Sequence, residues 1–246
     1  MPSVVCIAVA QSERDSLSPL MINPPPASDV ERRARLSAGR SSQAIHQMVS
    51  RALSDRGVQS ALLIDIGCGQ GDLFNHLAPL VDRFIGVDVA RYEALPDSIE
   101  FVQADAEDAR NLGPFIGKAD VVTAVETIEH LENPRTLVRL MASLVRIGGL
   151  VVITTPNQLS LLSILTLVVK GQFSQFQDVN YPAHLSALLP SDMRRMAAEA
   201  SLSEVTIDFS TSGRVVLTAR SYPRLISRAF PRWCSDNMML VARRLR

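Results

Sequence analysis

Short apolar runs alternate with segments of helical periodicity along most of the chain beyond residue 60. The runs that predict buried strands cover residues 61–66, 83–89, 99–103, 120–125 and 150–154. Helical spacing predicts helices from residue 29 onward, from 41 or 42 to 56, over 72–80, over 134–145 and over 191–200. Strands and helices that alternate at this spacing predict an α/β fold, with a mostly parallel sheet covered by helices.

The chain divides by composition into an N-terminal segment and one larger domain. The stretch Asn23-Pro24-Pro25-Pro26 predicts an extended linker, so we expect residues 1–28 to form a poorly ordered N-terminal segment. Residues 29–246 are expected to form a single domain. Within it, an apolar insertion is predicted at about residues 157–184 and a basic C-terminal segment from about residue 210.

Composition narrows the class of protein. Of the 246 residues, 47% are hydrophobic and 20% are charged, which excludes wholesale disorder. Equal numbers of basic and acidic side chains, 25 of each, argue against a general nucleic-acid binder. Three cysteines without a CxxC pair predict a reducing, cytoplasmic setting. No run reaches the roughly 18 apolar residues of a membrane-spanning helix.

A glycine-rich loop is predicted between the first strand and the helix that follows it. The sequence Asp65-Ile66-Gly67-Cys68-Gly69-Gln70-Gly71 allows a tight turn and a close approach of a ligand to the backbone. A dinucleotide fingerprint needs glycine at position 72, where Asp72 would repel a pyrophosphate. The loop therefore suits a ligand with a ribose and an ammonium group. Asp65 could accept a hydrogen bond from the ammonium group.

Two more carboxylates follow the next two predicted strands. Asp88 ends the second strand and Asp105 the third. An acid at the tip of the second strand can accept both hydroxyls of a ribose, and the next one can accept an exocyclic adenine amine. Singly, each aspartate is more typical of a turn or a helix cap. Because the three acids meet at the carboxyl edge of the sheet, a nucleoside site is the favoured interpretation.

This series of motifs resembles the class I S-adenosylmethionine-dependent methyltransferases, most of all over residues 60 to 155. The resemblance implies a Rossmann-like, seven-stranded sheet with one antiparallel strand, the last two strands lying at 204–209 and 237–242. It also implies S-adenosylmethionine as the cofactor, with Arg40 as a candidate for its methionine carboxylate. The implied cofactor-binding residues are Asp65, Gly67, Cys68, Gly69, Gly71, Asp88, Val89, Asp105, Ala106 and Glu126.

An acidic and histidine-containing segment follows the fourth predicted strand. Glu126, Glu129 and His130 would come together on one helical turn, and His184 could join them from a distant loop. Two carboxylates and imidazoles suit Mg²⁺, Mn²⁺ or Zn²⁺. The segment is similar to the ExxEH stretch of ubiquinone-pathway O-methyltransferases and small-RNA 2′-O-methyltransferases. Without an ion, Glu126 would line the cofactor pocket, Glu129 would cap a helix and His130 would bond within the loop.

The predicted chemistry is methyl transfer to oxygen. A hydroxyl acceptor must lose its proton, and His130 and His184 are the candidate catalytic bases, with metal activation as the alternative. No Asn-Pro-Pro-Tyr or Asp-Pro-Pro-Tyr sequence, the mark of amino-group methylation in this superfamily, follows the fourth strand. Thr154-Thr155-Pro156-Asn157 resembles the TPN of ubiquinone-type enzymes. The predicted function is therefore O-methylation of a small metabolite.

Two segments bear on the acceptor. The apolar stretch 159–169 predicts a core helix, a lid over a hydrophobic acceptor or an interfacial helix. The basic C-terminal segment predicts a solvated face or contact with anionic lipid. Together they favour an apolar or lipid-linked acceptor and a membrane-peripheral location. Two alternatives stay open, an RNA 2′-O-methyltransferase with a metal site and an S-adenosylmethionine-binding protein without catalysis.

Overall fold

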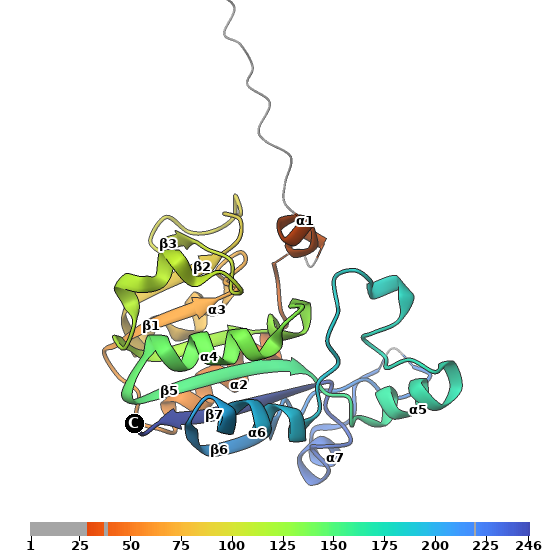
Figure 1. The fold of residues 1–246 in the computed structure, drawn as a ribbon. Helices are drawn as coiled ribbons and strands as arrows, with labels where there is room; N and C mark the ends of the chain where they lie inside the picture. The colour runs from red at the N-terminus through yellow and green to blue at the C-terminus, as the bar shows by residue number, and fades with distance from the viewer. Residues whose placement is uncertain (1–28, 37–38, 219) are drawn as a thin grey trace, which may run out of the picture.

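The computed structural model describes residues 29–36, 39–218 and 220–246 of the chain (Figure 1). The predicted N-terminal segment 1–28 lies outside the described residues. The strands are β1 (Ala61–Ile66), β2 (Val81–Asp88), β3 (Glu100–Gln103), β4 (Ala119–Val125), β5 (Val145–Pro156), β6 (Leu202–Phe209) and β7 (Asn237–Arg244). The α-helices are α1 (Asp29–Leu36), α2 (Gln43–Ser54), α3 (Asp72–Leu77), α4 (Pro134–Leu144), α5 (Leu161–Lys170), α6 (Pro190–Glu199) and α7 (Arg224–Ala229).

The seven strands form one sheet in the order β3-β2-β1-β4-β5-β7-β6. Strands β1 to β5 pair in parallel, whereas β7 is antiparallel to both β5 and β6. This arrangement confirms the predicted fold class, a seven-stranded and mostly parallel sheet with one antiparallel strand. The order reverses between β1 and β4, where open α/β sheets bind their ligands.

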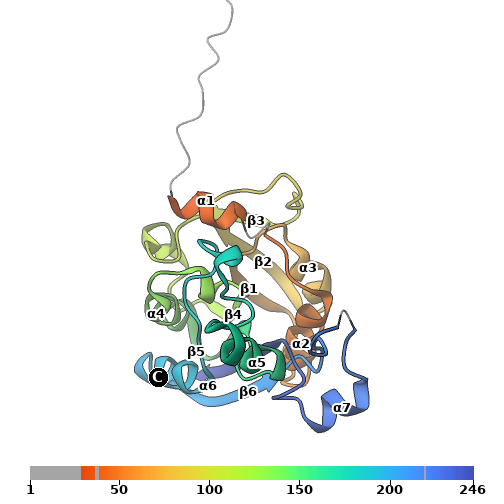
Figure 2. The same cartoon turned by 90° about the vertical axis from the view of Figure 1, so that its right-hand side faces the viewer.

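Alternation along the strands builds two hydrophobic layers. On β1, Ile64 and Ile66 pack into one buried cluster that includes side chains of α4 and α6, whereas Leu63 packs with side chains of α2 and α3. The sheet is therefore covered on both faces, as Figures 1 and 2 show. Each fully buried aliphatic side chain stabilises the fold by about 1.5–3 kcal/mol relative to an exposed one.

Two element boundaries differ from the sequence prediction by three residues or more. The helix predicted over 72–80 ends at Leu77 and continues as a 3₁₀ turn, because Pro79 cannot donate the backbone bond that an α-helix needs. Strand β5 begins directly after α4, at Val145, rather than at residue 150. Its first residues are accommodated by an irregularity in the pairing of β4 with β5, and Gly148 takes a φ of 81° there.

The predicted insertion contains α5, and the basic segment contains α7. Only Ser163 of α5 is buried, and several of its apolar side chains face outward, so it is not a core helix. The backbone N–H of Leu161 donates to the carbonyl of Trp233, which places the start of α5 beside the segment after α7. Within the described residues, no helix combines the length and the apolar character needed to cross a membrane.

Candidate functional site

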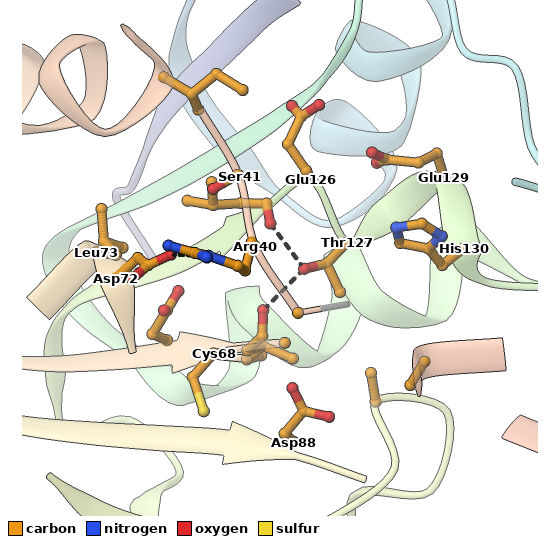
Figure 3. Close-up of a pocket in the computed structure, with 18 of the residues that line it drawn as sticks. Arg40, Ser41, Cys68, Asp72, Leu73, Asp88, Glu126, Thr127, Glu129 and His130 are labelled. Atoms are coloured by element: carbon orange, nitrogen blue, oxygen red, sulfur yellow. Dashed lines mark hydrogen bonds and ion pairs between the residues drawn. The ribbon is translucent and has the colours of Figure 1, made fainter. Parts of the chain in front are cut away.

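A cavity of about 600 Å³ lies at the carboxyl ends of the central strands. Residues from β1, β2 and β4 and the loops after them form its floor, and Figure 3 shows how these side chains point into it. Val30 and Ala34 of α1, residues 39–42 and residues 44–46 line another wall. The volume lies within the range of about 300–1,000 Å³ typical of small-molecule sites.

The glycine loop owes its shape to three residues in the left-handed region. Gly67, Gly69 and Gly71 have φ values of 74°, 51° and 79°. A Cβ atom on Gly67 would lie 2.3 Å from Thr127 Oγ1, and one on Gly69 would lie 2.2 Å from the Gly39 carbonyl oxygen. Any other residue at these positions would therefore be strained and would collide with its neighbours.

Asp65 and Asp88 lie beside the loop in the places predicted for them. The Asp65 carboxylate is buried and accepts a 2.6 Å hydrogen bond from the Thr123 hydroxyl. Burial raises its pKa to about 7, which an adjacent ammonium group would reverse. Asp88 accepts hydrogen bonds from the N–H groups of Gly69 and Val89, at 2.9 and 2.8 Å. The backbone N–H of Ala90 also interacts with this carboxylate, which leaves one of its four lone pairs for a ligand.

Eight of the ten predicted cofactor residues line the cavity: Asp65, Gly67, Cys68, Asp88, Val89, Asp105, Ala106 and Glu126. Gly69 and Gly71 shape the loop instead, the first by donating to Asp88 and the second by preceding α3 as its N-terminal cap. Asp105 also accepts a 2.8 Å bond from the N–H of Glu107, so the turn and the cavity share its carboxylate.

Arg40, the candidate for the methionine carboxylate, forms an ion pair with Asp72 at 3.4 Å and is two-thirds exposed at 66%. It lines the cavity, but with its charge already compensated. The neighbouring Ser41 hydroxyl lies 2.6 Å from Nε2 of His46, which is buried in α2 and also lines the cavity. Sequence periodicity gave no indication of this pair, because His46 occupies an ordinary core position of a helix.

The spacing predicts that Glu126, Glu129 and His130 share one helical turn, and the structure shows that this prediction is wrong for Glu126. Its φ is 49°, in the left-handed region, and only Ile128–His130 form a 3₁₀ turn, η3. Its two carboxyl oxygens accept from Thr154 Oγ1 at 2.9 Å and from Asn237 Nδ2 at 2.7 Å. Burial, followed by the charge of Glu129, raises the pKa of Glu126 well above its ordinary value.

Glu129, His130 and His184 come together at the same end of the cavity. Each offers one ligand atom, and these atoms all lie within 4.8 Å of one another. Among the described residues this group does not include Glu126. Figure 3 shows the Glu129 and His130 side chains next to each other. The structure thus brings together three of the four predicted metal ligands.

Backbone carbonyls fix both imidazoles. Nδ1 of His130 lies 2.6 Å from the Ala183 carbonyl, and Nδ1 of His184 lies 2.7 Å from the Gln175 carbonyl. A carbonyl can only accept, so Nδ1 carries the proton in each ring and Nε2 of the neutral ring keeps its lone pair. Burial lowers the pKa of both histidines, which keeps them neutral at pH 7.

The Glu129 carboxylate has no hydrogen-bond partner among the described residues, although it is only 1% exposed. Burial raises its pKa. An unpartnered buried carboxylate beside two free imidazole lone pairs is costly by itself and becomes favourable when a divalent cation binds. The donor set therefore fits Mg²⁺, Mn²⁺ or Zn²⁺.

Sequence reasoning missed one wall of the cavity, formed by Ser212, Arg214, Asp236 and Asn237. Asn157, the last residue of the TPN sequence, holds this wall in place. Its side-chain amide donates to the carbonyls of Arg232 and Ser235, both at 2.8 Å, and its N–H donates to the Asp236 carbonyl at 2.7 Å. The TPN sequence marked a position that supports the cavity wall, but it could not indicate partners so distant in the chain.

Comparisons with known proteins agree with this geometry. A family model described as a methyltransferase domain matches residues 37–206. The ubiquinone biosynthesis O-methyltransferase of Aeromonas salmonicida is 30% identical over 155 residues, which cover 59% of this chain and 64% of that protein. The Burkholderia pseudomallei protein of the same name is 32% identical over 157 residues, covering 59% and 66%. The matches thus span just under two thirds of these relatives.

Among solved structures, a SAM-dependent methyltransferase from Archaeoglobus fulgidus has a similar fold, with a TM-score of 0.58 and 18% identity. The alignment covers 80% of this chain and 94% of that one. Together with the family match, this confirms the resemblance stated from the sequence. The chain belongs to the methyltransferase domain family and has the seven-stranded fold of S-adenosylmethionine-dependent methyltransferases.

Proposed function

We propose that this protein is an S-adenosylmethionine-dependent methyltransferase that methylates a hydroxyl oxygen of a small molecule. The observation that carries the proposal is the juxtaposition, in one cavity, of the nucleoside-type acids with Glu129, His130 and His184. His130 is near enough to Asp88 for their charges to interact, so the two groups form adjacent parts of one site.

In this proposal the cofactor lies along the carboxyl edge of the sheet. Asp88 accepts the ribose hydroxyls, Asp105 accepts the adenine amine, and Asp65 faces the methionine ammonium. The fit is supported by Asp65, whose buried carboxylate has a pKa of about 7 in the absence of a cation. Because methyl transfer from a sulfonium is an in-line displacement, holding donor and acceptor in line is the main contribution of the protein.

The residues that would hold a divalent ion are Glu129, His130 and His184, without Glu126. When bound, such an ion supplies Lewis-acid activation of a hydroxyl. Without an ion, Nε2 of His130 or His184 would take the hydroxyl proton as a general base. Both roles need the same nitrogen lone pairs, so one histidine cannot serve as ligand and base at once.

The main test is a transferase assay with methyl-labelled S-adenosylmethionine, run with a lipid extract and with total small RNA as separate acceptor pools. Label transferred to lipid-soluble hydroxyl compounds would support the proposal. Label in RNA would favour 2′-O-methylation instead. Cofactor binding without transfer to either pool would favour the non-catalytic alternative. Full activity in excess EDTA would leave the histidines as bases and remove the ion from the mechanism.

We also propose that the acceptor is apolar or lipid-linked and is taken from a membrane surface. Outward-facing apolar residues of α5 support this, with Val168 76% and Val169 73% exposed. The start of α5 bonds to Trp233, after α7, and α7 itself begins with Arg224 and exposes Leu225 at 82%. An apolar surface beside arginines suits anionic lipid headgroups.

Co-sedimentation with vesicles of phosphatidylcholine and phosphatidylglycerol tests the membrane contact. The wild-type protein should sediment with the mixed vesicles, and Val168→Glu with Val169→Glu should abolish this. A matched control is Val179→Glu, because Val179 is equally exposed at 86% but lies outside α5. Equal sedimentation of the control and the α5 variant would contradict this part of the proposal.

A further inference from the structure

Two consecutive threonines, Thr154 and Thr155, precede the last residue of β5. Thr154 belongs to a complete arrangement, since its hydroxyl donates to Glu126 Oε1 at 2.9 Å and accepts from the Glu126 N–H at 3.0 Å. Thr155 differs, because its hydroxyl oxygen is fully buried and has no hydrogen-bond partner among the described residues. Buried hydroxyls without a partner are rare in folded proteins, so this one requires an explanation.

The Glu129 carboxylate is a buried hydrogen-bond acceptor that could pair with the Thr155 hydroxyl. Both of its oxygens are buried and also lack a partner among the described residues. The end of β5 packs against η3, the turn that contains Glu129, so the two side chains come from neighbouring elements. The Thr155 hydroxyl also opposes the rise in the pKa of Glu129. One side chain thus offers an unused donor and the other offers unused acceptors, on neighbouring elements of the fold.

We propose that Thr155 is a positioning residue for the metal site, whose hydroxyl donates to one Glu129 oxygen and so directs the other toward His130 and His184. The inference rests on the metal-binding part of the proposed function. Carboxylates that bind metals are themselves hydrogen-bonded by a second layer of groups that fixes their orientation. The two imidazoles already have this support from the carbonyls of Ala183 and Gln175. Thr155 would supply it for the third ligand.

The place of Thr155 in the fold suits this role. It lies in the central part of the sheet, where β5 pairs with β4 and β7, and its register partner in β7 is Met238. A β-branched side chain on a paired strand has few accessible rotamers, so little conformational entropy is lost when its hydroxyl is held in one direction. The backbone of Glu129 is fixed too, since its carbonyl accepts from Leu185 at 2.8 Å and Ser186 at 3.0 Å.

The experiment measures Mn²⁺ affinity by electron paramagnetic resonance, on the full chain without an acceptor, so the readout does not depend on turnover. Thr155→Val keeps the shape and removes the hydroxyl, and we expect the Kd for Mn²⁺ to rise about 10- to 100-fold. Thr155→Ser keeps the hydroxyl and should stay within about threefold of the wild type, since only a methyl group is lost. Ser235→Ala is the matched control, because Ser235 has another buried hydroxyl without a partner and lies outside the metal group.

Three outcomes overturn the inference. If Thr155→Val binds Mn²⁺ as tightly as the wild type, the hydroxyl does not orient Glu129. If Thr155→Ser or Ser235→Ala loses affinity as much as Thr155→Val, the effect comes from packing. If the wild-type protein binds no Mn²⁺, the metal site fails and Thr155 has no such role. Titration of each variant with S-adenosylmethionine reports independently on folding and on the cofactor part of the proposed function.

Discussion

Glu126 and Glu129 are only three residues apart and both line the cavity, yet the protein treats them in opposite ways. The side chain of Glu126 is held by Thr154 and Asn237, whereas both oxygens of Glu129 lack a partner within the described residues. Burial raises the pKa of both carboxyl groups. The difference therefore lies in hydrogen bonding rather than in exposure.

This contrast shows how a fold separates a structural carboxyl from one kept for a ligand. A buried carboxyl that receives two hydrogen bonds stabilises its surroundings and resists rearrangement. A buried carboxylate without donors is costly, and the cost is offset only when a cation arrives. Sequence spacing groups the two residues together, and only the partners distinguish them.

The largest expected effect is on Mn²⁺ affinity, when Glu129 and Glu126 are each replaced by glutamine in separate variants. Glu129→Gln removes a charged ligand, so the affinity for Mn²⁺ should fall about 100-fold or more, beyond the effect of a second-layer change. Glu126→Gln should leave the affinity within about threefold, because Glu126 is not a ligand in this interpretation. Titration calorimetry with Mn²⁺ measures both. Equal losses in the two variants would mean that both carboxylates bind the ion and would remove the contrast.

The second prediction tests whether the Asp88 carboxylate, which already accepts backbone hydrogen bonds, also binds S-adenosylmethionine. Asp88→Ala should weaken S-adenosylmethionine binding about 10- to 100-fold, since it removes hydrogen bonds to a charged group worth about 1.5–3 kcal/mol. Calorimetric titration of the cofactor checks this. Asp97→Ala is the control, because Asp97 is fully exposed and pairs only with Arg91 among the described residues. Unchanged affinity of Asp88→Ala would contradict the ribose assignment.

The third prediction concerns the free energy of unfolding of the metal-free protein, measured over a series of pH values. Because the pKa of Glu129 is raised on folding, the native state holds a proton that the unfolded chain releases at lower pH. This carboxyl therefore lowers the free energy of unfolding increasingly as pH rises above its ordinary pKa. Glu129→Gln should gain stability over the wild type as pH increases from about 5 to about 8, measured by urea unfolding in EDTA. A constant difference across this range would contradict the assignment.

The smallest expected effect concerns Thr154. Thr154→Val removes the hydroxyl that bonds to Glu126, so the free energy of unfolding should fall by about 1–2 kcal/mol. Mn²⁺ affinity should be unchanged, in contrast to Thr155→Val. Urea unfolding and the same Mn²⁺ titration measure the two quantities. A loss of metal affinity in Thr154→Val would show that the two threonines act as one unit.

The fold was predictable because strand alternation, glycines and acids occur close together in the sequence. The loop after β1, the acid that ends β2 and the acid that follows β3 are local features, and local chemistry placed them correctly at one edge of the sheet. The last two strands, over 204–209 and 237–242, came from the family resemblance rather than from periodicity, and β6 and β7 confirm them.

Parts of the site were not predictable because they depend on long-range partners. The left-handed φ of Glu126 is not a preference of glutamate, and its partner Asn237 lies 111 residues away. Arg40 was a reasonable candidate by position, but its ion pair with Asp72 forms only when α3 is in place. The role of His184 as a metal ligand stays a proposal, although the carbonyls of Ala183 and Gln175 account physically for its position beside His130.

The insertion of β7 between β5 and β6 has a consequence for synthesis on the ribosome. Strand β6 emerges first but has no neighbour in the sheet until β7 follows it, so it must wait in solution with its edge uncovered. The same late strand brings Asn237 to Glu126. The cavity wall is thus among the last parts of the molecule to form, and a nascent chain cannot acquire a finished site before β7 has left the exit tunnel.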